Sequence, residues 1–164
     1  MKAELREQLR CCLRGRVCFV GVGNVERGDD GFGVRLAEEL DRAGVRDVVF
    51  AGTTPEHRIG RYAERGFDHL IFLDAVECGA APGSVVLLDA REIACRFPQI
   101  STHNISLGVL AKYIESSGTT RAWLLGAQPE SVKPCAGLSP VMRKTLAAVV
   151  DLFGGILRKE TPLC

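Results

Sequence analysis

Five short apolar runs alternate with segments of helical hydrophobic periodicity, and this alternation constrains the fold more than any other feature of the chain. The apolar runs predict buried strands at 16–21, 45–51, 69–74, 84–89 and 121–126. Apolar residues spaced three or four apart predict helices at 2–14, 30–43, 56–65, 105–116 and 140–157. Strands that alternate with helices indicate an α/β domain layered on a mostly parallel sheet.

The link between the third and fourth predicted strands is too short to contain a helix. Only about nine residues separate 69–74 from 84–89, and Pro82-Gly83 directly precedes the second run. A parallel crossover needs roughly a dozen residues or more. We therefore expect these two strands to pair in an antiparallel manner.

Length and charge exclude several classes of protein. The 164 residues suit a single domain spanning 1–164, with the helical segment 1–14 as an N-terminal extension. The net charge of +1 argues against nucleic acid or an anionic membrane as partner. No apolar run approaches the roughly 18 residues of a membrane span, and Arg14 and Arg16 interrupt any signal peptide. We expect a cytoplasmic protein without membrane insertion.

The cysteines support the same location. There are seven, an odd number, and none forms a Cys-x-x-Cys pair. That pattern argues against a zinc ribbon, a thioredoxin-like redox site and an iron–sulfur cluster. Reduced thiols packed as small apolar groups in a reducing compartment are the simplest interpretation.

A glycine-rich turn follows the first predicted strand, between Gly21 and Gly31. Such turns often bind nucleotides, but Glu26 stands where the dinucleotide pattern needs glycine. Asp29 and Asp30 stand where a phosphate-binding loop needs lysine, and their charges would repel a phosphate. The turn therefore favours a cation over a phosphate, and either carboxylate could also cap the following helix.

Three residues far apart in the chain carry the most suggestive chemistry. Asp30 follows the first strand, Asp74 ends the third, and His103 lies in a loop before a helix. Taken singly, Asp74 could be a turn or capping residue and His103 a loop histidine. In this topology all three fall near strand carboxyl ends, where open α/β sheets bind ligands. Two carboxylates and an imidazole would suit a divalent ion such as Ni²⁺ or Zn²⁺.

Other catalytic arrangements fit poorly. The chain contains neither a Gly-x-Ser-x-Gly elbow nor a His-Glu-x-x-His helix. A Cys–His pair stays open, because the cysteines offer many candidates and none has a distinctive neighbourhood.

Four segments, in order and spacing, resemble the hydrogenase maturation protease family over about residues 17–140. They are Gly21-Val22-Gly23-Asn24 with Asp29-Asp30-Gly31, Leu73-Asp74-Ala75, Ser101-Thr102-His103-Asn104 and Gly126-Ala127-Gln128-Pro129-Glu130. Together with Gly52-Thr53-Thr54-Pro55-Glu56, the last two look most like the branch serving the formate-linked, hydrogen-evolving hydrogenase. The Asp-Gly-Gly loop common in relatives is replaced here by Phe50-Ala51-Gly52.

The resemblance implies both an activity and a fold. Members are endopeptidases that remove a C-terminal extension from the large-subunit precursor of [NiFe] hydrogenase. The fold would be a three-layer α/β sandwich, with a mixed, mostly parallel five-stranded sheet between helices. By position, the metal-contacting and catalytic residues would be Asp30, Asp74 and His103. The metal would be nickel in the substrate, with Zn or Cd as surrogate, and no organic cofactor is implied.

The resemblance leaves the chemistry open. Three ligands on an open, solvent-facing rim would suit docking onto nickel that the substrate already holds, so nickel would act as a checkpoint. Asp30 or Asp74 could hold a water as general base, or the metal could polarise the peptide carbonyl. One alternative uses the same residues: a nickel-dependent checkpoint chaperone that binds the large subunit without hydrolysis. The other alternative is a nucleotide-binding α/β enzyme, against which the Asp29-Asp30 pair argues.

Overall fold

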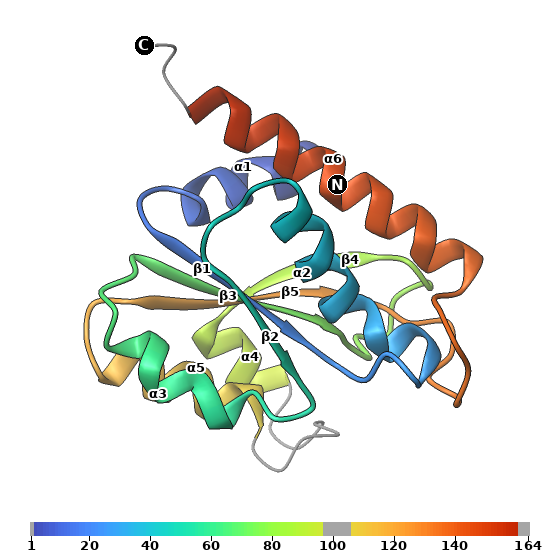
Figure 1. Cartoon of the computed structure of the whole chain (residues 1–164), viewed down its shortest axis with the longest axis horizontal. Helices are drawn as coiled ribbons and strands as arrows, with labels where there is room; N and C mark the ends of the chain where they lie inside the picture. The colour runs from blue at the N-terminus through green and yellow to red at the C-terminus, as the bar shows by residue number, and fades with distance from the viewer. Residues whose placement is uncertain (1, 97–105, 161–164) are drawn as a thin grey trace.

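The computed structural model describes residues 2–96 and 106–160 and contains a five-stranded sheet (Figure 1). The strands are β1 (Val17–Val22), β2 (Val48–Gly52), β3 (His69–Ala75), β4 (Val85–Asp89) and β5 (Arg121–Ala127), in the order β2-β1-β3-β5-β4. Four strands are parallel, and β4 runs antiparallel to β5. The mixed, mostly parallel sheet predicted from the sequence is confirmed.

Helices cover both faces of the sheet and complete the three layers. They are α1 (Lys2–Cys12), α2 (Phe32–Arg42), α3 (Glu56–Ala63), α4 (Ala90–Arg96), α5 (Leu107–Ser116) and α6 (Pro140–Glu160), and a short 3-10 helix, η1 (Gly28–Gly31), precedes α2. Helices α1, α2 and α6 lie on one face, and α3, α4 and α5 on the other (Figure 1). None of the helices among these residues is long and apolar enough to cross a bilayer.

The sheet separates two apolar clusters because successive strand residues point to opposite faces. On β1, Phe19 belongs to the cluster with α2 and α6, whereas Val20 belongs to the cluster on the other face. Phe19 also meets Phe153 of α6 edge to face, with ring centroids 5.5 Å apart. The helix α1 joins this same layer through the fully buried Leu9.

The fourth strand differs from the prediction in its partner. β4 does run opposite to β3, but β5 lies between them and is its only partner within the described sheet. The linking segment passes the carboxyl end of β5, where Gly83 N–H donates to the Gln128 carbonyl at 2.8 Å and Gln128 N–H to the Ser84 carbonyl at 2.8 Å. A short link restricts the direction of β4 relative to β3. It is still long enough for the chain to cross the end of β5, so that β4 pairs with β5 and not with β3.

Two helix beginnings also depart from the prediction. Helix α4 is absent from the sequence-based prediction and begins with a reciprocal cap. Glu92 N–H donates to Oδ1 of Asp89, and Asp89 N–H donates to Oε2 of Glu92. The helix predicted to begin at residue 30 begins at Phe32, with Gly31 as N-cap and no side-chain cap bond. The prediction that Asp29 or Asp30 caps this helix is therefore wrong.

Candidate metal-binding and catalytic site

The site begins where neighbouring parallel strands end and the chain departs in two directions. β1 is followed by η1 and α2 on the way to β2, on one side of the sheet. β3, on the other side of β1, leads toward β4 and β5. Open α/β sheets bind ligands at such a switch point, in the crevice beyond the carboxyl ends of the strands. Asp30 belongs to η1 and Asp74 to the end of β3, so the fold brings both to this crevice.

Close backbone packing draws these two residues together. A Cβ atom on Gly33 would overlap the carbonyl oxygens of Val22 and Leu73, so only glycine lets α2 settle onto the ends of both strands. Gly23 has φ +125°, and its added Cβ would overlap the Asp30 carbonyl and lie 3.6 Å from Oδ1 of Asp74. The glycines of the turn therefore allow the backbone around Asp30 to approach the ends of β1 and β3 closely.

The two carboxyl groups are buried and electrostatically coupled. Asn24 N–H donates to Oδ2 of Asp30 at 2.9 Å, and Ala75 N–H donates to Oδ1 of Asp74 at 2.8 Å. Burial, and then the neighbouring Asp30 charge, raise the pKa of Asp74 well above its usual range, against the lowering effect of the Ala75 N–H. Both effects disfavour the charged form of Asp74, and a cation shared by the two carboxyl groups would offset them.

The crevice is less open than the sequence analysis expects. Asp30 is 7% exposed and Asp74 is 6% exposed, so neither lies on a solvent-facing rim. The tight turn contributes to this burial, because η1 and the start of α2 pack against the strand ends.

The third predicted ligand, His103, lies outside the described residues, as does the whole Ser101-Thr102-His103-Asn104 motif. Its convergence with Asp30 and Asp74 therefore stays a prediction. Within 2–96 and 106–160, no three His, Cys, Asp or Glu side chains form a group that could hold a metal ion. His69 has a structural role at the opposite end of β3, where its Nδ1 accepts the Trp123 Nε1–H at 3.1 Å.

Asp29 holds the turn before Asp30 against a distant part of the chain through hydrogen bonds. It is fully buried, and its carboxylate accepts backbone N–H groups from Glu130, Ser131 and Ser139 at 2.9, 3.1 and 2.7 Å. Burial alone would raise the pKa of Asp29, but these donors outweigh it and hold the pKa below its usual value. Nothing local in the sequence indicates this, because the donors lie about a hundred residues away.

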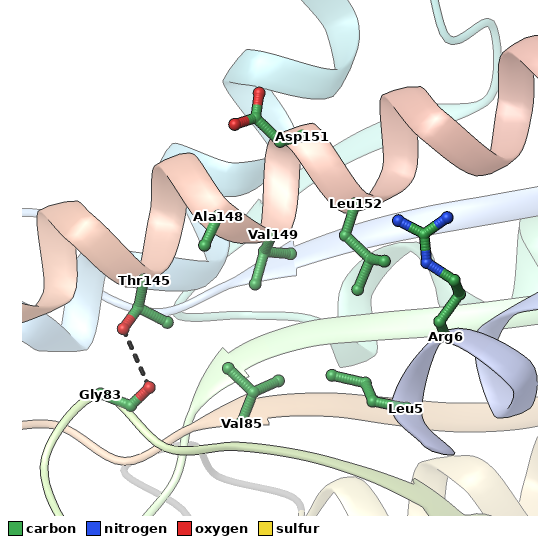
Figure 2. Close-up of a pocket in the computed structure, with 9 residues that line it drawn as sticks. All are labelled: Leu5, Arg6, Gly83, Val85, Thr145, Ala148, Val149, Asp151 and Leu152. Carbon is green, nitrogen blue, oxygen red and sulfur yellow. Dashed lines mark hydrogen bonds between the residues drawn. The ribbon is translucent and has the colours of Figure 1, made fainter. Parts of the chain in front are cut away.

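A separate groove lies between α1, α6 and the beginning of β4 (Figure 2). Its volume is about 380 Å³, and much of its lining is apolar, including Leu5, Val85 and Leu152. Thr145 Oγ1 donates to the Gly83 carbonyl at 2.9 Å at one end. Among the described residues that line it, only Arg6 and Asp151 are charged, so they include no pair of acidic groups like Asp30 and Asp74.

Comparison with known families identifies the family to which the chain belongs. The family model described as hydrogenase maturation protease matches residues 34–155, well over half of the chain. The chain belongs to the hydrogenase maturation protease family. The matched span includes Asp74 and His103 and begins just after Asp30. This protease is therefore an endopeptidase, as the resemblance implied.

Individual relatives agree with the family match. The hydrogenase 3 maturation protease of Escherichia coli K12 is 34% identical over 113 residues, covering 68% of this chain and 71% of the relative. The hydrogenase 2 maturation protease of the same strain is 29% identical over 153 residues, covering 88% and 92%. These similarities span both hydrogenase classes, so they do not distinguish the formate-linked branch.

A solved structure extends the agreement to the fold. The [NiFe] hydrogenase maturation protease HycI of Thermococcus kodakarensis superposes with a TM-score of 0.80 at 30% sequence identity. The match covers 92% of this protease and 99% of that chain, so nearly all of the fold is shared.

Proposed function

We propose that this protease removes the C-terminal extension of a [NiFe] hydrogenase large-subunit precursor after nickel insertion, and that it recognises the nickel in its substrate. The observation that carries the proposal is the buried pair Asp30 and Asp74 at the switch point of the sheet. Two adjacent buried carboxylates require a proton or a cation between them, and a substrate-held nickel ion would supply that cation.

The proposed ligands are Asp30, Asp74 and His103, two oxygens and one nitrogen. Such a set suits a borderline divalent ion, and it leaves positions for ligands that the substrate contributes. Nickel is thus part of the substrate, and Zn²⁺ or Cd²⁺ could replace it in binding experiments. Binding would be strongest when the precursor carries its metal, so nickel serves as a checkpoint before cleavage.

Hydrolysis needs one water and two proton transfers. The water oxygen adds to the peptide carbonyl carbon and the C–N bond breaks. One water proton is taken up by a base, and the amine leaving group gains a proton. Either Asp30 or Asp74 could accept the water proton and later return it, while the ion polarises the carbonyl. Both carboxylates recognise the ion, and either of them could serve as the base.

The partner hydrogenase belongs to the proposal as well. Gly52-Thr53-Thr54-Pro55-Glu56 and the Gln128-Pro129-Glu130 stretch favour a formate-linked hydrogenase precursor as substrate. Purified precursors of the formate-linked class and of a hydrogenase 2 class, offered in one mixture, would show which is processed faster. Preference for the hydrogenase 2 precursor would contradict the branch assignment alone.

The deciding assay uses purified protease with precursor prepared with and without nickel. Mass spectrometry should detect loss of the C-terminal peptide only from nickel-loaded precursor. Cleavage of nickel-free precursor at the same rate would refute the checkpoint. Tight nickel-dependent binding with no mass loss would instead support the checkpoint chaperone, whereas calorimetry with common nucleotides should show no binding.

A further inference from the structure

Two buried polar side chains, Asp29 and Gln128, connect the carboxylate-bearing loops to one stretch of chain. That stretch is the segment 128–139, which follows β5 and precedes α6. Asp29 is fully buried and Gln128 is 5% exposed. Buried polar groups are costly unless they are hydrogen-bonded, and both of these are engaged by segments far away in the sequence.

Asp29 fastens the Asp30 turn to the 128–139 segment. Beyond its three N–H acceptor contacts, its own N–H donates to the Ser131 carbonyl at 3.1 Å. Gly28 N–H donates to the Cys135 carbonyl at 3.0 Å, and Cys135 N–H donates to the Glu26 carbonyl at 3.1 Å. Hydrogen bonds therefore connect the turn that precedes Asp30 to this segment.

Gln128 fastens the Asp74 loop to the same segment. Its Oε1 accepts the Cys78 N–H at 2.8 Å, and its Nε2 donates to Oε2 of Glu77 at 2.7 Å. The neighbouring Val76 N–H donates to the Ala127 carbonyl at 2.9 Å. The residues just beyond Asp74 are thus held from β5 and its extension.

We propose that Asp29 and Gln128 are positioning residues, and that the 128–139 segment is the common brace that keeps Asp30 and Asp74 in one geometry. Whenever both carboxyl groups are charged, they repel each other through a poorly solvated region, and this repulsion would push the turn and the strand end apart. The brace opposes this motion, because it is hydrogen-bonded both to the turn before Asp30 and to the residues after Asp74. Its effect on catalysis rests on the proposed function, whereas its effect on geometry does not.

Amide hydrogen exchange measured by NMR tests the geometry directly. The reporters are Asn24 N–H, bonded to Asp30, and Ala75 N–H, bonded to Asp74. Asp29→Asn should accelerate exchange at Asn24, and Gln128→Ala at Ala75, each roughly tenfold relative to Ile71 in the centre of the sheet. Asp41→Asn and Gln8→Ala, at exposed positions, are matched controls and should change neither reporter.

Two results would overturn the brace. One is unchanged exchange at Asn24 and Ala75 in both variants. The other is equal acceleration at Ile71, which would mean that the side chains only stabilise the fold as a whole. If Asp29→Asn does not fold, Gln128→Ala decides the question through Ala75.

A kinetic measurement then separates the brace from the proposed function. Each variant that folds should process nickel-loaded precursor about tenfold more slowly in kcat/KM than the wild type, as loss of supporting contacts around ligands commonly does. Wild-type rates in both variants would contradict a positioning role. If the wild type itself processes no precursor, the proposed function fails, and hydrogen exchange still decides the brace.

Discussion

The two ends of β3 handle buried polar groups in opposite ways. At the amino end, His69 accepts a hydrogen bond from the indole of Trp123, so that a donor and an acceptor satisfy each other. At the carboxyl end, Asp74 lies beside a second carboxylate, and its pKa rises because burial and Asp30 both disfavour the charged form. Complementary pairing at the first end stabilises the fold. Like charges held together at the second end create a demand for a proton or cation, which is characteristic of functional sites.

Neutralising Asp74 should produce the largest effect on the functional end. We expect Asp74→Asn to lower the processing rate of nickel-loaded precursor by roughly 100-fold or more, because one candidate ligand and base is lost. Its melting temperature should stay the same or rise, since the repulsion from Asp30 disappears. Processing followed by mass spectrometry and a thermal melt measure the two quantities, with the exposed Asp41→Asn as control. Wild-type processing would exclude Asp74 from the site.

A side chain added at Gly33 should push α2 away from the ends of β1 and β3. This shift should separate the two carboxylates and lower the free energy of unfolding. Gly33→Ala places a methyl group against the carbonyls of Val22 and Leu73, and should lower the free energy of unfolding by about 1–3 kcal/mol. Gly60→Ala in α3, where no atom lies within 4 Å of the added Cβ, should instead add about 0.5–1 kcal/mol.

Urea unfolding of both glycine variants checks this contrast. If Gly33→Ala is as stable as Gly60→Ala, the close approach of α2 does not shape the crevice.

The amino end of β3 offers a smaller, pH-dependent effect. Burial lowers the pKa of His69, and Arg121 adds to the lowering while Asp68 opposes it. The pKa of the folded state is thus below the unfolded value of about 6.5. The stability that the neutral ring contributes is present above pH 6.5 and is lost as the pH falls through the folded pKa.

Fluorescence of Trp123, the single tryptophan, should report this titration. Protonation of His69 breaks the bond from the indole, so the fluorescence should change with a midpoint below 6.5. A midpoint above 6.5 would contradict the assignment of His69 as a neutral acceptor. The matching change should be absent in His69→Gln and present in His57→Gln.

Sequence reasoning recovered the parts of the fold that local patterns determine. The strands, five of the helices and the approach of Asp30 to Asp74 follow from hydrophobic period and from the position of strand ends. The partner of β4 was misassigned, because a short link specifies direction but not which strand lies alongside. Helix α4 was missed although Asp89 and Glu92 form its cap, since the segment is short.

The buried interior of the site was harder to predict. Asp29 or Asp30 was expected to cap a helix, whereas the Asp29 carboxylate accepts N–H groups from Glu130, Ser131 and Ser139. No local pattern encodes that pairing. The prediction that Asp30 and Asp74 lie on an open rim was also wrong, because both are buried. Their exposure depends on how closely the turn packs against the strand ends, which the sequence does not show. His103 lies outside the described residues, and its role stays a prediction.

A crystal structure of the protease soaked with Zn²⁺, with the ion located by anomalous scattering, tests the central claim most directly. The account predicts one ion bound by an oxygen of Asp30, an oxygen of Asp74 and a ring nitrogen of His103, each at about 2.0–2.2 Å. An ion bound elsewhere, or an ion at the two carboxylates with the His103 ring beyond contact, would contradict it.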